Sequence, residues 1–500
     1  MAIATAATAT ASALGATTWH IARNAAPPTF DDAWYLEVSF RLFSALKTGP
    51  LAFLHAYSEA FRIKAPLISL VPLPLYALFG MGERVAVWAN LPLAALAAWA
   101  WSRAAAVWWR DHPRGRDAAA LGGALAALLP LAYGLSRVFF VETLLSALLA
   151  LWAWRCAAAK KEDRAEGVRL GVLLGLGLLA KVTFPLLAAG LAWPARERLK
   201  PHAKTLLLSG GAIAATWYAV NLPYVLGFAW SAGFGRIAKD YAGAGGVAAI
   251  LAWLASILRN GLSWPLAAAM FACIATAAWA RKSRLDGGTR AALWGLAPLL
   301  VFAAGVNPEP RLAAPLLPLI ALLAARAAVD FDSPRARGTA AALLLGTALT
   351  VCIDQTFLAP RPRALDYNGA PSADIGWDRS ALVDAVKSSG GLVAALSHES
   401  PRLNANNLSC LAASRSLPLS FISLGYAQNS VENALIRLKD KGATTLVLIE
   451  GIPNSELPDF LNRAASGITA AVASGRLRAE EYVRIAVSPG VTARVMRLKR

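Results

Sequence analysis

Long apolar stretches alternate with short polar segments over residues 1–357 of the chain. Most of these stretches have about 20 residues, the length of an α-helix that crosses the hydrocarbon core of a bilayer. We therefore expect about eleven transmembrane helices in this part of the chain. The expected helices are residues 3–22, 85–109, 118–135, 138–154, 170–184, 185–195, 205–223, 262–280, 291–306, 312–329 and 338–357.

Two further apolar stretches, at residues 66–79 and 247–259, are too short to cross a bilayer. Pro72 and Pro74 also interrupt the first of them. We interpret both stretches as helices that lie at the outer face of the membrane.

The pattern changes after residue 357, where short strand-like runs alternate with helical ones. This alternation predicts that residues 358–500 form a soluble α/β domain. The segment contains no GxGxxG or P-loop motif that would indicate a nucleotide. Strands are expected at residues 392–396, 418–424, 444–450 and 482–487, and helices at 380–388, 431–441 and 457–475.

The composition supports a membrane protein. Hydrophobic residues make up 57% of the chain and charged residues only 16%, against about 25% charged in ordinary soluble domains. The net charge of +19 does not indicate nucleic acid as a partner, because the lysines and arginines gather in short loops between apolar stretches. The four cysteines and five histidines are scattered, so neither a disulfide framework nor a zinc site is expected.

The basic loops also give the expected orientation. They alternate with basic-poor loops near residues 136–142 and 307–311. Because basic loops stay in the cytoplasm, the N-terminus is expected inside. The first loop (23–84), the loop 224–261 and the domain 358–500 then face outside. We expect a multi-pass protein of the bacterial inner (cytoplasmic) membrane, in contact with membrane lipids.

The segment FDDAWYLEV (30–38) carries the strongest candidate chemistry. Asp31 and Asp32 precede an amphipathic helix in the first outer loop. Two interpretations are open for them. Adjacent carboxylates in an outer loop suit acid–base chemistry, but an Asp before a helix is also an ordinary N-cap.

Four sequence motifs follow one another in residues 1–357. They are FDDAWYLEV, Lys64-Ala65-Pro66-Leu67 with Leu78-Phe79-Gly80 behind it, GVLLGLGLLAKVTFP at 171–185, and Pro310-Arg311. In order, spacing and expected sidedness they resemble the GT-C superfamily of membrane glycosyltransferases. The similarity is greatest to the branch of protein mannosyltransferases and lipid A aminoarabinose transferases. The chain departs from that pattern at Asp32, Ala65 and Leu312, where Glu, Pro and Tyr are usual.

The resemblance implies an inverting glycosyltransferase that moves a hexose or pentose from a polyprenyl-phosphate donor. It leaves open whether a lipid, a polysaccharide or a protein accepts the sugar. By the resemblance, Asp31 takes the acceptor proton and Asp32 supports it. Cations at the same face should stabilise the lipid phosphate, and Glu142 resembles a second acidic position of the superfamily. The candidates for binding the lipid phosphate and sugar are Lys64, Glu142, Lys181, Arg236 and Arg311.

The resemblance also leaves the cofactor open, because some members of the superfamily bind a divalent cation. Here Asp31 and Glu142 would hold Mg²⁺ or Mn²⁺. A different class of function is open as well: a non-catalytic or transport protein on the same scaffold, such as a lipid-linked glycan flippase or export partner. Such a protein would not need Asp31. The near absence of charge at mid-depth of the apolar stretches argues against ion-coupled transport.

The alternation of basic loops predicts that residues 160 and 400 lie on opposite sides of the membrane. Reporter fusions placed after these two residues test this directly. The fusion after residue 160 is expected to report the cytoplasm and the fusion after residue 400 the outside. If both fusions report the same side, the orientation is wrong.

Overall fold

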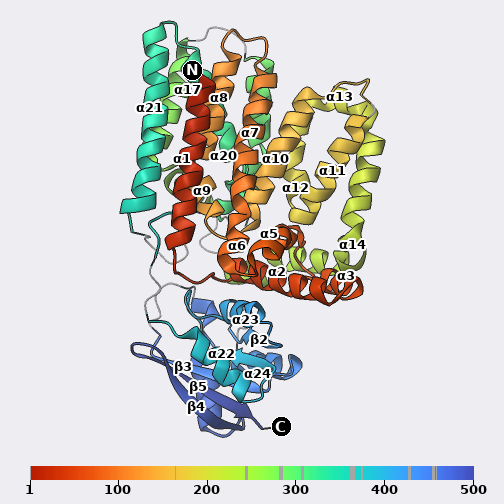
Figure 1. The fold of residues 1–500 in the computed structure, drawn as a ribbon, viewed down its shortest axis with the longest axis vertical. Helices are drawn as coiled ribbons and strands as arrows, with labels where there is room; N and C mark the ends of the chain where they lie inside the picture. The colour runs from red at the N-terminus through yellow and green to blue at the C-terminus, as the bar shows by residue number, and fades with distance from the viewer. Residues whose placement is uncertain are drawn as a thin grey trace.

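The computed structural model describes residues 2–499 except 164, 242–245, 281–284, 306–308, 361–365, 373–375, 426–429, 453–456 and 458. A bundle of helices stands above a smaller part that contains a β-sheet (Figure 1). The helices of the bundle are α1 (Ala2–Arg23), α6 (Glu83–Trp88), α7 (Asn90–Trp108), α8 (Gly115–Ala127), α9 (Pro130–Ser136), α10 (Val141–Ala158), α11 (Ala165–Ala180), α12 (Phe184–Ala192), α14 (Ala203–Gly233), α17 (Trp264–Ala280), α18 (Gly287–Leu296), α19 (Pro298–Ala303), α20 (Leu317–Val329) and α21 (Pro334–Ile353). Shorter helical segments connect them: η1 (Trp193–Ala195), α13 (Arg196–Leu199), η2 (Lys200–His202), α15 (Arg236–Tyr241), α16 (Val247–Ser256), η3 (Ile257–Leu262), η4 (Pro310–Ala313) and η5 (Asp354–Leu358).

The helical class is confirmed, whereas the number of membrane crossings stays a prediction. Within the described residues, four helical segments are long and apolar enough to span a membrane, and up to six if each bent pair counts as one span. One bent pair is α8 with α9, at 52°, where Pro130 begins the second helix. The other runs from α16 and η3 into α17 with a bend of 99°. The expected helix at 291–306 is likewise two helices, α18 and α19, because Pro298 interrupts it.

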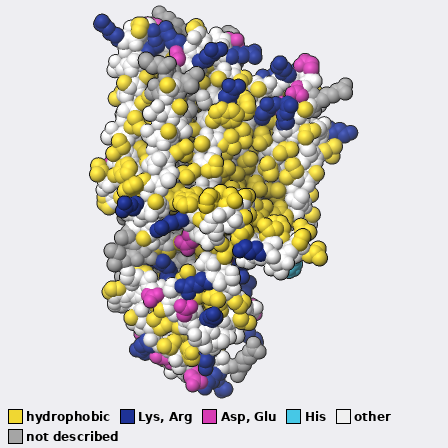
Figure 2. Space-filling model, viewed as in Figure 1, with side chains coloured by type: hydrophobic (Ala, Val, Ile, Leu, Met, Phe, Trp, Pro, Cys, Tyr) yellow, Lys and Arg dark blue, Asp and Glu magenta, His cyan; other side chains and the backbone are white. Residues whose placement is uncertain are grey.

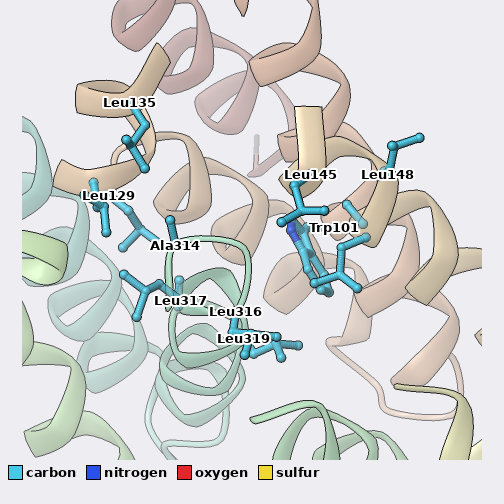
Figure 3. Close-up of a cluster of buried hydrophobic side chains, with 14 of the residues drawn as sticks. Trp101, Leu129, Leu135, Leu145, Leu148, Ala314, Leu316, Leu317 and Leu319 are labelled. Atoms are coloured by element: carbon cyan, nitrogen blue, oxygen red, sulfur yellow. The ribbon is translucent and has the colours of Figure 1, made fainter. Parts of the chain in front are cut away.

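Small residues let the bundle helices approach closely. Gly167, Gly171 and Gly175 form one stripe of α11 that packs on α14. A Cβ on Gly171 would collide with Ser209 Oγ and lie 2.7 Å from the carbonyl oxygen of Leu206. This small-xxx-small spacing is typical of close contacts between membrane helices. Larger apolar side chains of α7, α10 and α20, among them Trp101, Leu145 and Leu319, fill the bundle core (Figure 3).

Four short helices lie across one end of the bundle: α2 (Asp31–Thr48), α3 (Pro50–Glu59), α4 (Leu67–Leu70) and α5 (Leu73–Phe79) (Figure 1). The last two correspond to the stretch 66–79 that we expected to lie along the membrane. Leu78 and Phe79 at its end are 74% and 64% exposed, which suits contact with lipid. The opposite side of α2 contacts α23 (Ala405–Ser414) of the C-terminal part.

The C-terminal part has the expected α/β composition. Its strands are β1 (Val393–Leu396), β2 (Ser420–Ser423), β3 (Thr445–Glu450), β4 (Ala479–Ser488) and β5 (Val491–Leu498). They form one sheet in the order β2-β1-β3-β5-β4. The pairs β1–β2 and β1–β3 are parallel, and the pairs of β5 with β3 and β4 are antiparallel. The helices are α22 (Arg379–Ser388), α23, α24 (Val431–Asp440), η6 (Asp459–Leu461) and α25 (Ala465–Ala473).

The four expected strands are confirmed, and so are the helices at 380–388 and 431–441. The helix expected at 457–475 is shorter, because the regular α-helix begins only at Ala465. Strand β5 and helix α23 were not predicted from the sequence. Helix α23 is rich in Ala, Asn and Ser rather than in large apolar residues, so its sequence has little amphipathic pattern.

The surface of the bundle shows the charge pattern expected for a membrane protein (Figure 2). Hydrophobic side chains cover its middle, and blue Lys and Arg side chains gather at the upper end, where α1 begins and α13 lies. The C-terminal part lies at the opposite end. This separation agrees with the expected orientation, in which basic loops face the cytoplasm.

The close contact of α11 with α14 predicts that Gly171→Leu destabilises the bundle. A larger side chain there would push the two helices apart, at a cost of about 1–3 kcal/mol. Thermal unfolding of purified protein in detergent measures the effect. Gly211→Leu is the matched control, because a Cβ on that glycine of α14 meets nothing within 4 Å. Equal midpoints for the two variants would contradict the proposed packing.

Candidate functional site

Three side chains from distant parts of the sequence meet at the end of the bundle. Asp31 lies in the first turn of α2, Lys64 in the loop after α3, and Arg311 in η4. Lys64 Nζ lies 2.5 Å from Asp31 Oδ1, and Arg311 donates to Asp31 Oδ2 at 3.0 Å. The structure therefore brings together the expected base and two of the expected phosphate-binding cations. Their roles in a reaction stay predictions.

Neither carboxylate of the Asp31–Asp32 pair is a simple helix cap. The N-cap position of α2 is Phe30, and no side chain caps the helix. Asp32 is 6% exposed and accepts a hydrogen bond of 2.9 Å from the backbone N–H of Phe139. This bond joins α2 to the segment before α10, so Asp32 holds the end of α2 in place. The N-cap interpretation is wrong because both side chains have partners outside their own helix.

Strained backbone surrounds this site. Phe30, immediately before Asp31, has a φ of 44°, and Phe61 and Arg62, shortly before Lys64, have φ of 55° and 58°. Such left-handed conformations cost about 1–3 kcal/mol for non-glycine residues and are retained where the surroundings enforce them. Here the ring of Phe61 packs against Trp34 and Tyr35, with centroids 5.2 Å and 5.4 Å apart.

The environment fixes the charge of Asp31. Burial alone would raise the pKa of its carboxyl. The adjacent Lys64 and Arg311 together lower this pKa by more than burial raises it, so the pKa lies well below its ordinary value. Each cation also lies over an aromatic ring. Lys64 Nζ is 4.7 Å from the centroid of Trp34, and the guanidinium of Arg311 is 4.9 Å from that of Phe140. In the absence of a ligand, Asp31 is thus an anion at neutral pH, held between two oriented cations.

A second ion pair lies in the bundle nearby. Lys181 donates to Glu142 Oε1 at 2.8 Å, and Glu142 is only 1% exposed. Its other oxygen has no hydrogen-bond partner among the described residues. Arg311 interacts electrostatically with both Asp31 and Glu142, which places the two pairs close together. Glu142 lines a small cavity of about 40 Å³ and not the large cavity beside Asp31.

The last expected cation is not assigned a position. Arg236 begins α15, but its side chain lies outside the described part of the chain. A different arginine, Arg137, is buried and donates to Thr356 Oγ1 at 2.5 Å, over the ring of Tyr133. Arg137 therefore joins α9 to η5.

A cavity of about 1530 Å³ separates the end of the bundle from the C-terminal part. Asp31, Lys64 and Arg311 line it on the bundle side. The opposite wall is formed by the C-terminal part, near the ends of β1 and β2. Its polar residues include Glu399, Arg402 and Asn406 after β1, Ser423 at the end of β2, Arg437 of α24 and Lys441 just after that helix.

Sequence reasoning identified none of the residues of that opposite wall. The available signal was the order of strands, because ligands of parallel α/β sheets bind beyond the carboxyl ends of the strands. Glu399 is the best example. Its Oε1 accepts from the backbone N–H of Ala405 at 2.8 Å, and its Oε2 from the hydroxyl of Ser423. The residue also faces the cavity.

The two carboxylates that were expected to hold a divalent cation have cationic side-chain partners in this structure. Both oxygens of Asp31 are bound by Lys64 and Arg311, and Glu142 Oε1 is bound by Lys181. A metal ion would have to displace these partners, because it binds carboxylate oxygens directly, so a divalent cation stays a prediction. In the described residues, no cluster of three or more His, Cys, Asp or Glu side chains offers another set of ligands.

Comparison with solved structures identifies the fold. The chain is similar to ArnT from Cupriavidus metallidurans in its apo state, with a TM-score of 0.58 and 15% identity over 96% of this chain and 95% of that one. It is also similar to ArnT bound to undecaprenyl phosphate, with a TM-score of 0.60 and 14% identity over 98% and 97% of the two chains. The Archaeoglobus fulgidus oligosaccharyltransferase in complex with Zn and sulfate gives a TM-score of 0.55 and 13% identity over 89% and 67%.

These likenesses establish the fold. ArnT, a lipid A aminoarabinose transferase, and the oligosaccharyltransferase are GT-C superfamily members, as the sequence motifs led us to expect. The similarity extends over both the bundle and the C-terminal part of the chain. No family model matches the sequence, and no curated protein matches it.

The lowered pKa of Asp31 predicts a pH-dependent contribution to stability. A carboxyl whose folded-state pKa lies below the ordinary value of about 3.9 stabilises the fold above that value. We expect Asp31→Asn to unfold more readily than wild type at pH 7. The difference is expected to shrink by about 1 kcal/mol per pH unit below pH 4.

Thermal unfolding in nanodiscs between pH 7 and pH 2.5 measures this difference. Asp111→Asn is the control, because that carboxylate is 93% exposed. A difference between wild type and Asp31→Asn that is the same at pH 7 and pH 2.5 would show that the ion pairs do not lower the pKa.

Proposed function

We propose that this protein, whose fold is that of the GT-C membrane glycosyltransferases, transfers a sugar from a polyprenyl-phosphate donor to an acceptor, with inversion. The reaction would take place at the outer face of the cytoplasmic membrane, with the C-terminal domain outside. The observation that carries this proposal is the Asp31 carboxylate held between Lys64 and Arg311 at the wall of a large cavity. This cluster combines a base for the acceptor with cations for the leaving phosphate.

The surroundings suit a lipid-linked donor. Solved structures with this fold include ArnT bound to undecaprenyl phosphate and AglB in complex with an inhibitory peptide and a dolichol-phosphate. Exposed apolar side chains lie on the short helices beside the site: Leu51, Leu54, Leu78 and Phe79. They would contact the lipid chain, while the phosphate enters the cavity toward Lys64 and Arg311. Partly desolvated cations of this kind bind phosphate oxygens strongly.

The proposed chemistry is one displacement. The acceptor hydroxyl or amine attacks the anomeric carbon of the sugar and gives its proton to Asp31. The bond between that carbon and the phosphate oxygen breaks, and its electron pair leaves with the polyprenyl phosphate. Attack from the face opposite the phosphate inverts the configuration. Lys64 and Arg311 stabilise the charge that develops on the leaving phosphate.

Donor binding would also activate the base. Before the donor enters, the two cations keep the pKa of Asp31 low, so the carboxylate is a weak base. A phosphate that engages Lys64 and Arg311 adds negative charge beside Asp31 and competes for its partners. Both effects raise the pKa of the carboxyl, so proton transfer becomes favourable only when the donor is bound.

The roles of the remaining candidates follow from their positions. The ion pair of Glu142 and Lys181 would contribute to the electrostatic environment of Arg311 from the bundle side. Asp32 would fix the position of the first turn of α2. Arg236 stays a candidate for donor binding. A flippase or export partner on the same scaffold has no need for a carboxylate held between two cations at the cavity wall, so the enzyme is favoured.

The proposal predicts that Asp31→Asn abolishes transfer. Loss of a general base slows such reactions about 100- to 10,000-fold, whereas the amide is nearly the same size as the carboxylate. Mass spectrometry of lipid-linked sugars and surface glycans in cells with and without the gene first identifies donor and product. Transfer by purified wild type and Asp31→Asn is then measured with that donor.

Asp111→Asn serves as the matched control, since its carboxylate is exposed and outside the cavity. Binding of undecaprenyl phosphate verifies that each variant is folded. If Asp31→Asn binds the lipid and transfers sugar within about twofold of wild type, Asp31 is not the base, and the catalytic proposal fails.

A further inference from the structure

The segment that joins the bundle to the C-terminal domain crosses the site. Residues 366–372, here called the strap, line the cavity through Asp366, Tyr367, Asn368, Gly369 and Ser372. They lie beyond the stretch covered by the four sequence motifs. Connecting segments are normally exposed at the surface and variable in sequence. This one instead follows the wall of the cavity.

Hydrogen bonds hold the strap along its length. Asn368 Nδ2 donates to the carbonyl oxygen of Asn260 at 2.7 Å, and the N–H of Ala370 donates to that of Ala359 at 2.8 Å. At its end, Ser372 pairs with the segment after α1. Its N–H donates to Asn24 Oδ1 at 3.0 Å, and its carbonyl oxygen accepts from Ala25 at 2.9 Å. The strap is thus anchored at three places.

Gly134 of α9 makes this course possible. A Cβ at that position would collide with Asn368 Oδ1 and lie 3.0 Å from the carbonyl oxygen of Tyr367. The strap therefore lies directly on the helix backbone. Asn368 Oδ1 itself is buried without a hydrogen-bond partner among the described residues, which costs free energy and shows how tightly the segment is held.

The anchored strap directs Tyr367 toward the ion-pair cluster. Its ring meets Phe140 edge to face, with centroids 5.6 Å apart, and Phe140 in turn carries the guanidinium of Arg311 on its face. Tyr367 also interacts electrostatically with Arg311. The two residues line the same cavity as Asp31. Tyr367 and Arg311 therefore share Phe140 as a neighbour and face the same cavity, which brings a neutral hydroxyl donor into the region of the cation that the proposed function assigns to the phosphate.

We propose that Tyr367 is a phosphate-binding residue of this site, which donates its hydroxyl hydrogen to the lipid phosphate that Arg311 holds. This inference rests on the proposed function, because that function supplies the phosphate. Asn368 and Gly134 are positioning residues that fix the strap. The segment leading to the C-terminal domain thereby completes the binding site for the donor.

Binding of undecaprenyl phosphate to the full chain in nanodiscs tests the proposal without requiring turnover. Neutral undecaprenol is the reference that isolates the contribution of the phosphate. Tyr367→Phe removes only the hydroxyl and is expected to weaken phosphate-specific binding about 10-fold or more, the usual effect of one hydrogen bond to a charged group. Tyr482→Phe is the matched control, because Tyr482 also lies near an arginine, Arg497, but on strand β4 and not at the cavity.

Gly134→Ala provides a second variant, which changes none of the proposed phosphate ligands chemically but alters the position of the strap that carries Tyr367. It is expected to displace the strap and to weaken the same binding, with the undecaprenol reference unchanged. Lys64→Ala shows the loss expected for a direct phosphate ligand. Melting temperatures measured alongside separate a loss of binding from a loss of folding.

The possible results distinguish the two proposals. Wild type that prefers undecaprenyl phosphate to undecaprenol, with a tenfold loss in Tyr367→Phe and none in Tyr482→Phe, supports the role of Tyr367. If Lys64→Ala loses binding but Tyr367→Phe stays within twofold of wild type, Tyr367 is not a ligand and the proposed function stands. If wild type shows no preference for the phosphate, the proposed function and this inference fail together.

Discussion

The carboxylate of Asp31, shared between Lys64 and Arg311, is the interaction on which the rest of this end of the molecule depends. A charge that leaves water is costly unless it is paired and hydrogen-bonded. The three residues come from α2, from the loop after α3 and from η4, so their pairing fixes three chain segments at once. These ion pairs and the packing of Phe61 hold the three segments together, in keeping with the strained backbone at Phe30, Phe61 and Arg62.

Helix α2 transmits this constraint to both parts of the protein. On the bundle side, Ser39 donates to the carbonyl oxygen of Ser69 at 2.8 Å, and Ser69 donates to that of Tyr35 at 2.9 Å. On the other side, Arg41 donates to the carbonyl oxygen of Leu419 at 3.0 Å. Asp31 lies in the first turn of α2. A shift of the C-terminal domain that moved α2 would therefore also move the carboxylate of Asp31. The cavity therefore has walls whose positions are mechanically linked.

The sequence predicted the parts of this arrangement that depend on local patterns. Apolar stretches gave the helical bundle, and short runs after residue 357 gave four of the five strands. The motifs around Asp31, Lys64 and Arg311 pointed to one site through their resemblance to the GT-C superfamily. The geometry of that site, with both oxygens of one carboxylate bound by the two cations, was not predictable from spacing.

Other features depend on tertiary contacts that leave no local signal. Asp32 looks like a helix cap in sequence, yet its partner is the backbone of Phe139, 107 residues away. Tyr367 lies in a linker that contains no recognisable motif. Its position at the site depends on the contact of the strap with Gly134 and of its own ring with Phe140. Likewise, Glu399 and Arg437 become cavity residues only because the sheet turns its strand ends toward the bundle.

The charge balance of the site favours the transition state of the proposed reaction over its ground state. A sugar-linked polyprenyl phosphate is a diester with one negative charge, and the leaving polyprenyl phosphate gains a second as the bond breaks. Asp31 loses its own charge in the same step by taking the acceptor proton. Lys64 and Arg311, which the bound phosphate already engages, can therefore strengthen their contacts with it as its negative charge grows and the carboxylate loses its own. Interactions that strengthen as the reaction proceeds are the ones that accelerate it, and a pair of cations shared by base and leaving group would provide them.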